Sequence, residues 1–270
     1  MSGGIRIVET GWSTTIQDLG RSGFAHLGVP RAGAVDAAAQ AVANRLVGND
    51  QRAATLETAG GLVVETIGAA VAATSGDGVR HTLQPGDRLR VDAPDDGIWA
   101  YLAVRGGIQV EPVLGSRSHD TLSGVGPAAV RPGDVLDVGD DPHTELVTDH
   151  APVRPRSRVV HLWPGPRAGW FVRGLDALID EEWQVGADVS RVGVRLSAGR
   201  FDPTAEMPAR IGSEGLVTGA IQITPGGEPI VMLANHPTTG GYPVIAVVEP
   251  DDISIVAQAA PGTTIRFRHA

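Results

Sequence analysis

The first part of the chain gathers acids, amides and an arginine among turn-forming glycines. Gln17, Asp18 and Arg21 lie in a loop with glycines at positions 20, 23, 28 and 33. Glycine permits tight turns and close backbone approach, so polar groups between these positions can be presented to a ligand. Asp18 could accept a proton, and the planar fork of Arg21 could hold a carboxylate or phosphate. The structural alternative is an Asp–Arg ion pair that fixes a turn.

Three further polar residues, Asp36, Asn44 and Glu57, follow in chain order. Asp36 begins an expected helix, where an acid gains about 0.3 to 1 kcal/mol from the helix dipole, so a structural role is expected. The amide of Asn44 should bond either a neighbouring turn or a substrate. Glu57 stands just before Gly60-Gly61, where a strand would pair it with an arginine or expose it. Catalysis by Glu57 is the alternative.

Arginines also stand beside later turns. Arg105 directly follows an expected strand from Ile98 to Val104 and precedes Gly106-Gly107, a position where a backbone can approach a ligand closely. The segment Ser116-Arg117-Ser118 combines two hydroxyls with a guanidinium, a combination that suits an anion or an ordinary surface turn.

The second half of the chain offers two more candidate turns. In Ser213-Glu214-Gly215, Ser213 can cap the turn and Glu214 is the functional candidate. Between Asn235 and Pro243, a Gly-Gly turn is surrounded by a titratable histidine, hydroxyls and a phenol, of which His236, Thr239 and Tyr242 are candidates. The remaining histidines show no H-E-x-x-H spacing, so no metal site is expected.

Composition excludes several kinds of chemistry. The chain has no cysteine, and all 22 of its basic residues are arginines. Thiol catalysis, disulfides, a Walker lysine, a Schiff base, a biotinyl-lysine and a Ser-Lys catalytic pair are therefore excluded for this chain. G-x-x-x-x-G-K-[ST] and G-x-S-x-G motifs are also absent from the sequence. Another chain must contribute if the reaction needs a recognisable ATPase or serine hydrolase.

Charge and hydropathy bear on partners and location. The net charge of -9 repels nucleic acid phosphates and anionic lipids, so neither is an expected partner. No apolar run approaches the roughly 20 residues that span a bilayer, and the first residues do not resemble a signal peptide. We expect a cytoplasmic protein.

The alternation of apolar residues predicts a mainly β fold. Gly and Pro number 36 and 19, and between them lie short strand-like runs: Leu62–Glu65, Arg88–Asp92, Ile98–Val104, Arg158–Trp163, Pro229–Ala234, Val244–Val248 and Thr263–Arg268. Three Pro-Gly turns, at residues 85, 132 and 261, each precede such a run. Helices are expected over Asp36–Val47 and Gly169–Glu182. A proline-rich passage from Gly139 to Arg158 predicts two domains, 1–148 and 149–270.

Several sequence blocks resemble a known family. Besides the N-terminal segments, they are Tyr101–Ile108, Leu114–Ser118, Arg191–Leu196, Ser213–Gly215 and Thr238–Pro243. Together they resemble the family of the 5-oxoprolinase C subunit, also called the allophanate hydrolase subunit 2 or biotin-dependent carboxyltransferase family. The resemblance implies cyclophilin-like β-barrels in two packed halves. It also implies a protein that acts with partner A and B subunits to open 5-oxo-L-proline to L-glutamate, with ATP bound in the complex.

On this interpretation, Asp18, Glu57 and Glu214 are the catalytic candidates. Arg21, Arg105 or Arg117 would bind anions, and the remaining candidate substrate-binding residues are Gln17, Asn44, Ser116, His236, Thr239 and Tyr242. Asn235 and Ser190 depart from the family, which usually has Asp at the first position and Asp or Asn at the second. Two other functions stay open: the carboxyltransferase component of a urea carboxylase or allophanate hydrolase system, and a regulatory protein that binds a kinase inhibitor.

Overall fold

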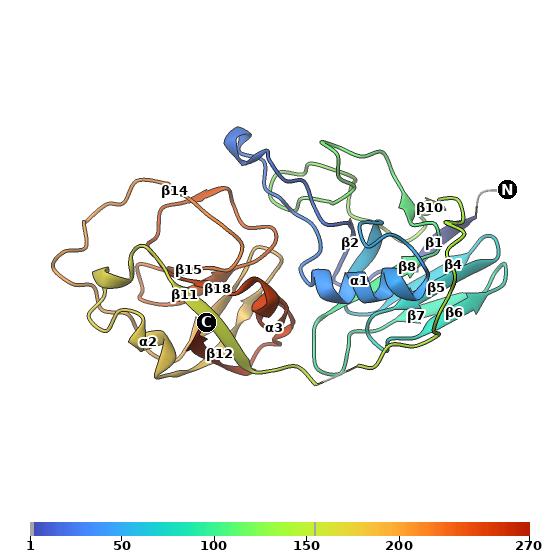
Figure 1. The fold of residues 1–270 in the computed structure, drawn as a ribbon. Coiled ribbons are helices and arrows are strands. Elements are labelled where there is room, and N and C mark those ends of the chain that lie inside the picture. Colours follow the sequence, from blue (N-terminus) through green and yellow to red (C-terminus); the bar gives the residue numbers. More distant parts are fainter. Residues whose placement is uncertain (1–2, 154) are drawn as a thin grey trace. The chain divides into compact units, whose positions relative to one another are not determined.

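The structure, a computed structural model, describes residues 3–153 and 155–270, and these form two units with separate cores (Figure 1). Unit 1 comprises the chain up to Ser22 together with Arg31–Pro155. Unit 2 comprises Gly23–Pro30 and Arg156–Ala270. The domain boundary predicted after residue 148 stays a prediction, and the chain passes from unit 1 to unit 2 at Pro155.

Unit 1 contains two five-stranded antiparallel sheets. One has the order β7-β4-β1-β10-β9 and the other β2-β3-β8-β5-β6. The strands of the first sheet are β1 (Gly4–Glu9), β4 (Leu62–Thr66), β7 (Arg88–Val91), β9 (Ile108–Gln109) and β10 (Val135–Val138). Those of the second are β2 (Ser13–Gln17), β3 (Thr55–Ala59), β5 (Ala70–Thr74), β6 (Arg80–Leu83) and β8 (Trp99–Val104).

Both sheets of unit 1 contribute to one apolar core. Ile5 and Val64 come from the first sheet, and Leu56 and Leu102 come from the second; each is at most 1% exposed. In β7, Leu89 and Val91 are buried while Arg88 and Arg90 are exposed, as expected for a strand with one face in the core. All six residues of β8 are buried, because helix α1 covers the face of β8 that does not meet the core (Figure 1).

Helix α1 (Ala37–Leu46) confirms the helix predicted over residues 36–47. Asp36 is its N-cap, and its Oδ1 accepts a hydrogen bond from the backbone N–H of Ala39 at 2.9 Å. The predicted structural role of Asp36 is therefore visible in the cap. A short 3-10 helix, η1 (Ala25–Leu27), precedes it in the sequence and belongs to unit 2.

Unit 2 is built on a closed seven-stranded barrel with the order β11-β18-β15-β16-β13-β12-β19. Its strands are β11 (Val159–Pro164), β12 (Glu182–Val189), β13 (Gly193–Ser197), β15 (Ala220–Ile223), β16 (Pro229–Met232), β18 (Val244–Val248) and β19 (Thr264–His269). A separate two-stranded sheet pairs β14 (Glu214–Gly215) with β17 (Thr239–Gly240). The helical segments are η2 (Ala168–Trp170), α2 (Asp176–Ile179), η3 (Pro250–Asp252) and α3 (Ile253–Gln258).

The mainly β prediction is confirmed, but the helix predicted over Gly169–Glu182 is wrong. That segment contains the end of η2, the one-turn helix α2 and the start of β12. Gly174 has a positive φ of 50°, which interrupts a right-handed helix. The backbone N–H of Val172 instead bonds the carbonyl of Asp202 at 3.0 Å. Long-range backbone pairing therefore overrides the apolar periodicity.

The three Pro-Gly turns each lead into a strand, as predicted. They precede β7, β10 and β19. In the first two, the aspartate after the glycine closes the turn: Asp87 accepts from the backbone of Gln84 at 2.8 Å, and Asp134 accepts from Arg131 at 2.7 Å. This side-chain bond explains why the Pro-Gly-Asp sequence recurs at the two places.

Candidate functional site

Asp18 lies at the centre of a buried network in unit 1. Its Oδ1 accepts from the Ser116 hydroxyl at 2.6 Å, the Ser118 hydroxyl at 2.6 Å and the backbone N–H of Gly20 at 2.8 Å. Its Oδ2 accepts from the backbone N–H of Arg117 at 2.6 Å. These residues are called the Asp18 network below. Because four donors occupy the carboxylate, Asp18 joins the end of β2 to the loop that carries Ser116.

The Asp18 network depends on a close backbone contact that requires glycine. Gly20 has a φ of 79°, and a Cβ atom built there would lie 2.5 Å from the carbonyl oxygen of Arg31. Gly33 has a φ of 92°, and its Cβ would lie 2.8 Å from the backbone nitrogen of Gly20. These glycines therefore permit a close backbone approach, as predicted, but the group that approaches is the protein's own backbone and not a ligand.

Arg21 is almost fully buried, with 2% of its surface exposed. Its Nη2 donates to the carbonyl of Ser118, and its Nε donates to the carbonyl of Val113 at 3.4 Å. Burial lowers the pKa of the Arg21 guanidinium, and the nearby carboxylates of Asp120 and Asp18 partly offset this effect. Arg21 thus holds the backbone of the loop that also supplies the serine hydroxyls.

Arg117 has a mixed environment. Its backbone N–H belongs to the Asp18 network, whereas its side chain lies outside that network. The Nε of its side chain donates to the carbonyl of Val110 at 2.8 Å, and its Nη2 donates to Oε1 of Gln109 at 3.2 Å. The guanidinium is only partly buried.

Gln40 and Asn44 tie α1 to the neighbouring backbone, and Gln17 is bonded from both sides. Gln17 donates to the Thr15 hydroxyl at 2.9 Å and to the carbonyl of His119 at 3.0 Å. Gln40 donates to the backbone carbonyl of Gln17 at 2.9 Å. Asn44, one turn later on the same helix face, donates to the carbonyl of Ala53 at 2.9 Å. Of the two partners predicted for Asn44, the structure provides the neighbouring turn.

Glu57 is fully buried on β3, so it is not exposed as one prediction had it. Its Oε2 accepts from the Tyr101 hydroxyl at 2.7 Å and from the backbone N–H of Val35 at 2.9 Å. The Tyr101 hydroxyl itself accepts from the backbone N–H of Asp36 at 2.8 Å. Burial, followed by the charges of Glu57 and Asp36, raises the pKa of Tyr101 well above its ordinary value. This arrangement fixes the start of α1 against two strands.

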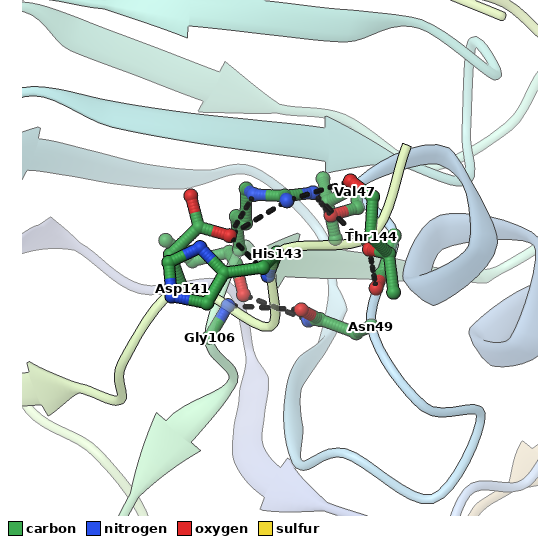
Figure 2. A network of polar contacts seen from close by, with 9 residues as sticks. Val47, Asn49, Gly106, Asp141, His143 and Thr144 are labelled. Atoms are coloured by element: carbon green, nitrogen blue, oxygen red, sulfur yellow. Dashed lines mark hydrogen bonds and ion pairs between the residues drawn. The ribbon is translucent and has the colours of Figure 1, made fainter. Parts of the chain in front are cut away.

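Arg105, directly after β8, bonds a loop after β10, and its partners Val47, Asp141 and Thr144 are labelled in Figure 2. Its Nε donates to Oδ1 of Asp141 at 2.8 Å, and its Nη1 donates to the carbonyl of Val47 at 2.9 Å. Its Nη2 donates to the carbonyl of Thr144 at 2.8 Å and lies 2.6 Å from Oδ1 of Asp141. The hydrogen bond from Arg105 is the main cause that lowers the pKa of Asp141. All three guanidinium nitrogens therefore have partners within the chain.

Glu214 stands in a different environment, in unit 2. It forms an ion pair with Arg167, and both side chains are about one-third exposed, at 31% and 33%. The Arg167 guanidinium also lies 4.5 Å from the centre of the Trp170 ring, within the range of a cation–π contact. These three residues are called the Glu214 cluster below.

The last predicted block, Asn235–Pro243, contains β17, which pairs with the strand that carries Glu214. Glu214 pairs with Gly240, and Gly215 pairs with Thr239, across β14 and β17. Thr239 is exposed, and Tyr242 is 43% exposed. His236 instead is 7% exposed, and its Nδ1 lies 2.7 Å from the carbonyl of Pro237. Burial lowers the pKa of His236, which favours the neutral ring.

The structure thus divides the predicted residues between the two units. Unit 1 holds Gln17, Asp18, Arg21, Asn44, Glu57, Arg105, Ser116 and Arg117, and unit 2 holds Glu214, His236, Thr239 and Tyr242. Sequence reasoning did not select Gln40, Tyr101, Ser118, Arg167 or Trp170. Gln40 and Asn44 are four residues apart and therefore share one face of the predicted helix, which was a signal in the sequence that their amides act together. The contacts of Tyr101 with Glu57 and of Arg167 with Glu214 join distant segments and had no local signal, whereas Arg167 and Trp170 are only three residues apart.

Comparison with known proteins shows the family. The model of the carboxyltransferase domain, subdomain A and B, matches residues 27–269. The chain belongs to this family. It is 35% identical to the 5-oxoprolinase C subunit of Escherichia coli (strain K12), over 97% of this chain and 90% of that protein. It is 30% identical to urea amidolyase of Saccharomyces cerevisiae, over 97% of this chain but 16% of that protein.

Solved structures of this carboxyltransferase-domain family have the same fold. TTHA0988 has a TM-score of 0.86 and 34% identity, covering 99% of this chain and 56% of that chain. Kluyveromyces lactis urea amidolyase also has a TM-score of 0.86, with 27% identity, covering 98% of this chain and 18% of that one. The chain therefore spans less than two-thirds of both structures.

Two further observations concern metal sites and membrane-spanning helices in the described residues. Over residues 3–153 and 155–270, no three His, Cys, Asp or Glu side chains are grouped so that they could hold a metal ion. The helices of the same residues are all too short or too polar to span a bilayer.

Proposed function

We propose that this chain is one component of an ATP-dependent 5-oxoprolinase, which opens 5-oxo-L-proline to L-glutamate together with partner subunits. One observation carries the proposal: the 35% identity to the C subunit of a 5-oxoprolinase extends over 97% of this chain and 90% of that relative. A second relative of the same name, from Haemophilus influenzae, is 28% identical over the same shares. The partners would be homologues of the 5-oxoprolinase A and B subunits, and ATP would bind in the complex.

The reaction sets requirements for any protein that contributes to it. Water must add across the lactam C–N bond, and the amide carbonyl is a weak electrophile. Transfer of the γ-phosphoryl group of ATP to its oxygen would release ADP and activate the carbon for attack by water. The C–N bond would then break to leave an amine and an acyl phosphate, and a second water would release L-glutamate and phosphate. A group that takes a proton from water or gives one to the departing ring nitrogen would then assist the step.

Among the three acids proposed as catalytic, accessibility favours Glu214. Asp18 is 9% exposed and its carboxylate already accepts four hydrogen bonds, while Glu57 is fully buried. The Glu214 side chain is 31% exposed and paired with a single arginine, Arg167. We therefore assign proton handling to Glu214, and we assign the shape of the surrounding surface to Thr239 and Tyr242 beside it. In this proposal Asp18, Arg21 and Glu57 have a structural role, because they bond separate segments of unit 1 to one another.

A second candidate function is carboxyl transfer. The family model carries that name, and the likeness to Kluyveromyces lactis urea carboxylase, with a TM-score of 0.85 and 26% identity, favours it. This chain has no lysine to carry biotin, so the carboxylated carrier would have to be another chain. This chain covers 16% of a urea amidolyase and 27% of the urea carboxylase structure, against 90% of the 5-oxoprolinase C subunit. Carboxyl transfer is therefore the weaker proposal.

The deciding experiment assembles the chain with candidate A and B subunits and measures glutamate and ADP formed from 5-oxoproline and ATP. The expected result is stoichiometric formation of both products by the complex and none by this chain in isolation. A fully assembled complex that consumes neither substrate would overturn the assignment. In the same preparation, transfer of carboxylate from a carboxybiotin donor tests the second candidate.

A further inference from the structure

Unit 1 contains a cavity that the proposed function does not use. It has a volume of about 380 Å³. It lies where β1 begins and where β8 and β10 end, with Gly4, Val104 and Val138 in its wall. Small-molecule pockets commonly have volumes of about 300 to 1,000 Å³ and often occur at the open ends of β structures.

The wall of this cavity has an apolar part and a charged part. Val71, Leu83 and Val104 provide aliphatic surface. On the charged part, the lining contains Arg105, Asp140 and Asp141. Arg105 pairs with Asp141, and Asp140 is the neighbouring residue in the chain, so one arginine and two aspartates share the wall with hydrocarbon surface. A ligand complementary to it carries both charges on one small group and has an aliphatic body.

The charged residues differ in how firmly they are held. The Arg105 side chain is 11% exposed, and its Nη1 is fixed by the carbonyl of Val47. Asp141, at the edge of the network in Figure 2, is 52% exposed, and its Oδ1 accepts from Arg105 and from the backbone N–H of His143 at 2.7 Å. Within the described residues Asp140 forms no hydrogen bond or ion pair and is exposed. The guanidinium is thus a fixed group, the Asp140 carboxylate can turn toward a ligand, and the Asp141 carboxylate can do so once a ligand replaces it on Arg105.

We propose that this cavity binds a free aliphatic α-amino acid as a zwitterion. The ligand carboxylate takes the place of Asp141 on Nε and Nη2 of Arg105, which suits the planar fork of the guanidinium. The released Asp141 carboxylate and that of Asp140 accept the ligand ammonium. One intrachain ion pair is exchanged for two ligand contacts, and the aliphatic side chain covers Val71 and Leu83.

Charge sets the preference among amino acids. Arg105 contributes one positive charge and Asp140 and Asp141 contribute two negative charges, so this group of residues has a net charge of -1. The whole chain has a net charge of -9. An acidic side chain is therefore disfavoured, and a neutral aliphatic one such as that of leucine is preferred. Binding at this cavity does not depend on the proposed function, because it concerns unit 1 of this chain alone.

Calorimetric titration of the full chain with L-leucine tests the proposal. We expect saturable binding by L-leucine, and binding at least about tenfold weaker by L-glutamate, by isocaproate, which lacks the ammonium, and by isoamylamine, which lacks the carboxylate. Absence of leucine binding would overturn the proposal. Equal affinity for isoamylamine would overturn the zwitterion, and equal affinity for L-glutamate would overturn the charge preference.

Three variants locate the site. Asp140→Asn should weaken leucine binding about tenfold, because it removes one acceptor of the ammonium. Ala69→Leu, at an exposed position in the cavity wall, should abolish binding by filling the space. Asp137→Asn is the matched control, since Asp137 is exposed on β10 but outside the cavity lining. Unchanged binding by Ala69→Leu, in a protein with unchanged thermal stability, would place any leucine site elsewhere.

Discussion

Asp18 in unit 1 and Glu214 in unit 2 began as similar candidates, since both are acids in segments that contain turn-forming glycines. The structure gives them opposite environments. Asp18 is 9% exposed and holds four donors from two loops. Glu214 is 31% exposed and is paired with one partly exposed arginine. A buried acid whose acceptors are all used stabilises the fold, whereas a partly exposed acid with one partner is available for proton transfer.

The arginines show the same difference. Arg21 and Arg105 bond backbone carbonyls of their own unit, and Arg105 also pairs with Asp141, which joins segments far apart in the sequence. Arg167 contacts a carboxylate and an indole ring at a partly exposed position. Burial and the number of internal partners therefore distinguish these arginines.

The largest expected effect is loss of stability on removal of the Asp18 carboxylate. Asp18→Ala leaves the buried hydroxyls of Ser116 and Ser118 and two backbone N–H groups without their acceptor. We expect the free energy of unfolding to fall by about 4 kcal/mol. Urea denaturation measures it, with Asp137→Ala as an exposed control. Wild-type stability combined with loss of activity would reverse the comparison and make Asp18 the functional acid.

Next in size is an effect on activity without a matching effect on stability. Glu214→Gln should lower kcat of the assembled 5-oxoprolinase complex about 100-fold, because the amide cannot exchange a proton. The partly exposed ion pair with Arg167 should contribute little to stability. Glu228→Gln is the matched control, since Glu228 pairs with Arg195 in the same unit at 2.9 Å. Equal losses in both variants would remove Glu214 from the proposed site.

A smaller effect is expected at Arg105. Arg105→Lys keeps the charge but cannot bond Val47, Asp141 and Thr144 at once. Stability should fall by about 2 kcal/mol, and amide hydrogen exchange around Thr144 should become faster. A variant that loses the activity of the complex with its melting temperature and exchange unchanged would instead identify Arg105 as an anion-binding residue of the reaction.

The smallest effect is a pH dependence that originates at Tyr101. Its pKa is raised in the folded protein, so above about pH 10 the unfolded chain loses a proton that the folded chain keeps. Stability contributed by this group is complete below that pH and falls by about 1.4 kcal/mol per pH unit above it. Denaturation at several alkaline pH values should show this fall in the free energy of unfolding in the wild type and in Tyr242→Phe, but not in Tyr101→Phe. Persistence of the slope in Tyr101→Phe would assign it to another group.

Much of the fold followed from local patterns. The runs at residues 62–65, 88–92 and 244–248 are strands because their alternation or apolar content fits a sheet, and Asp36 caps α1 because its side chain can reach the next turn. The helix predicted from residue 169 failed because its periodicity competed with pairing to a segment about 30 residues away. For the site, sequence identified the polar loops but not which acids remain accessible.

The sequence by itself determined the chemistry that this protein can and cannot supply. With no lysine or cysteine, it has neither an attachment point for biotin nor a thiol nucleophile. Its ordered motifs identified the family, and the comparison with known proteins then showed that family. Only the tertiary structure decided the environment of each candidate. Partners such as Ser118 for Asp18, Tyr101 for Glu57 and Thr144 for Arg105 come from distant segments. Burial and hydrogen bonding are set by these long-range contacts, which local sequence does not encode.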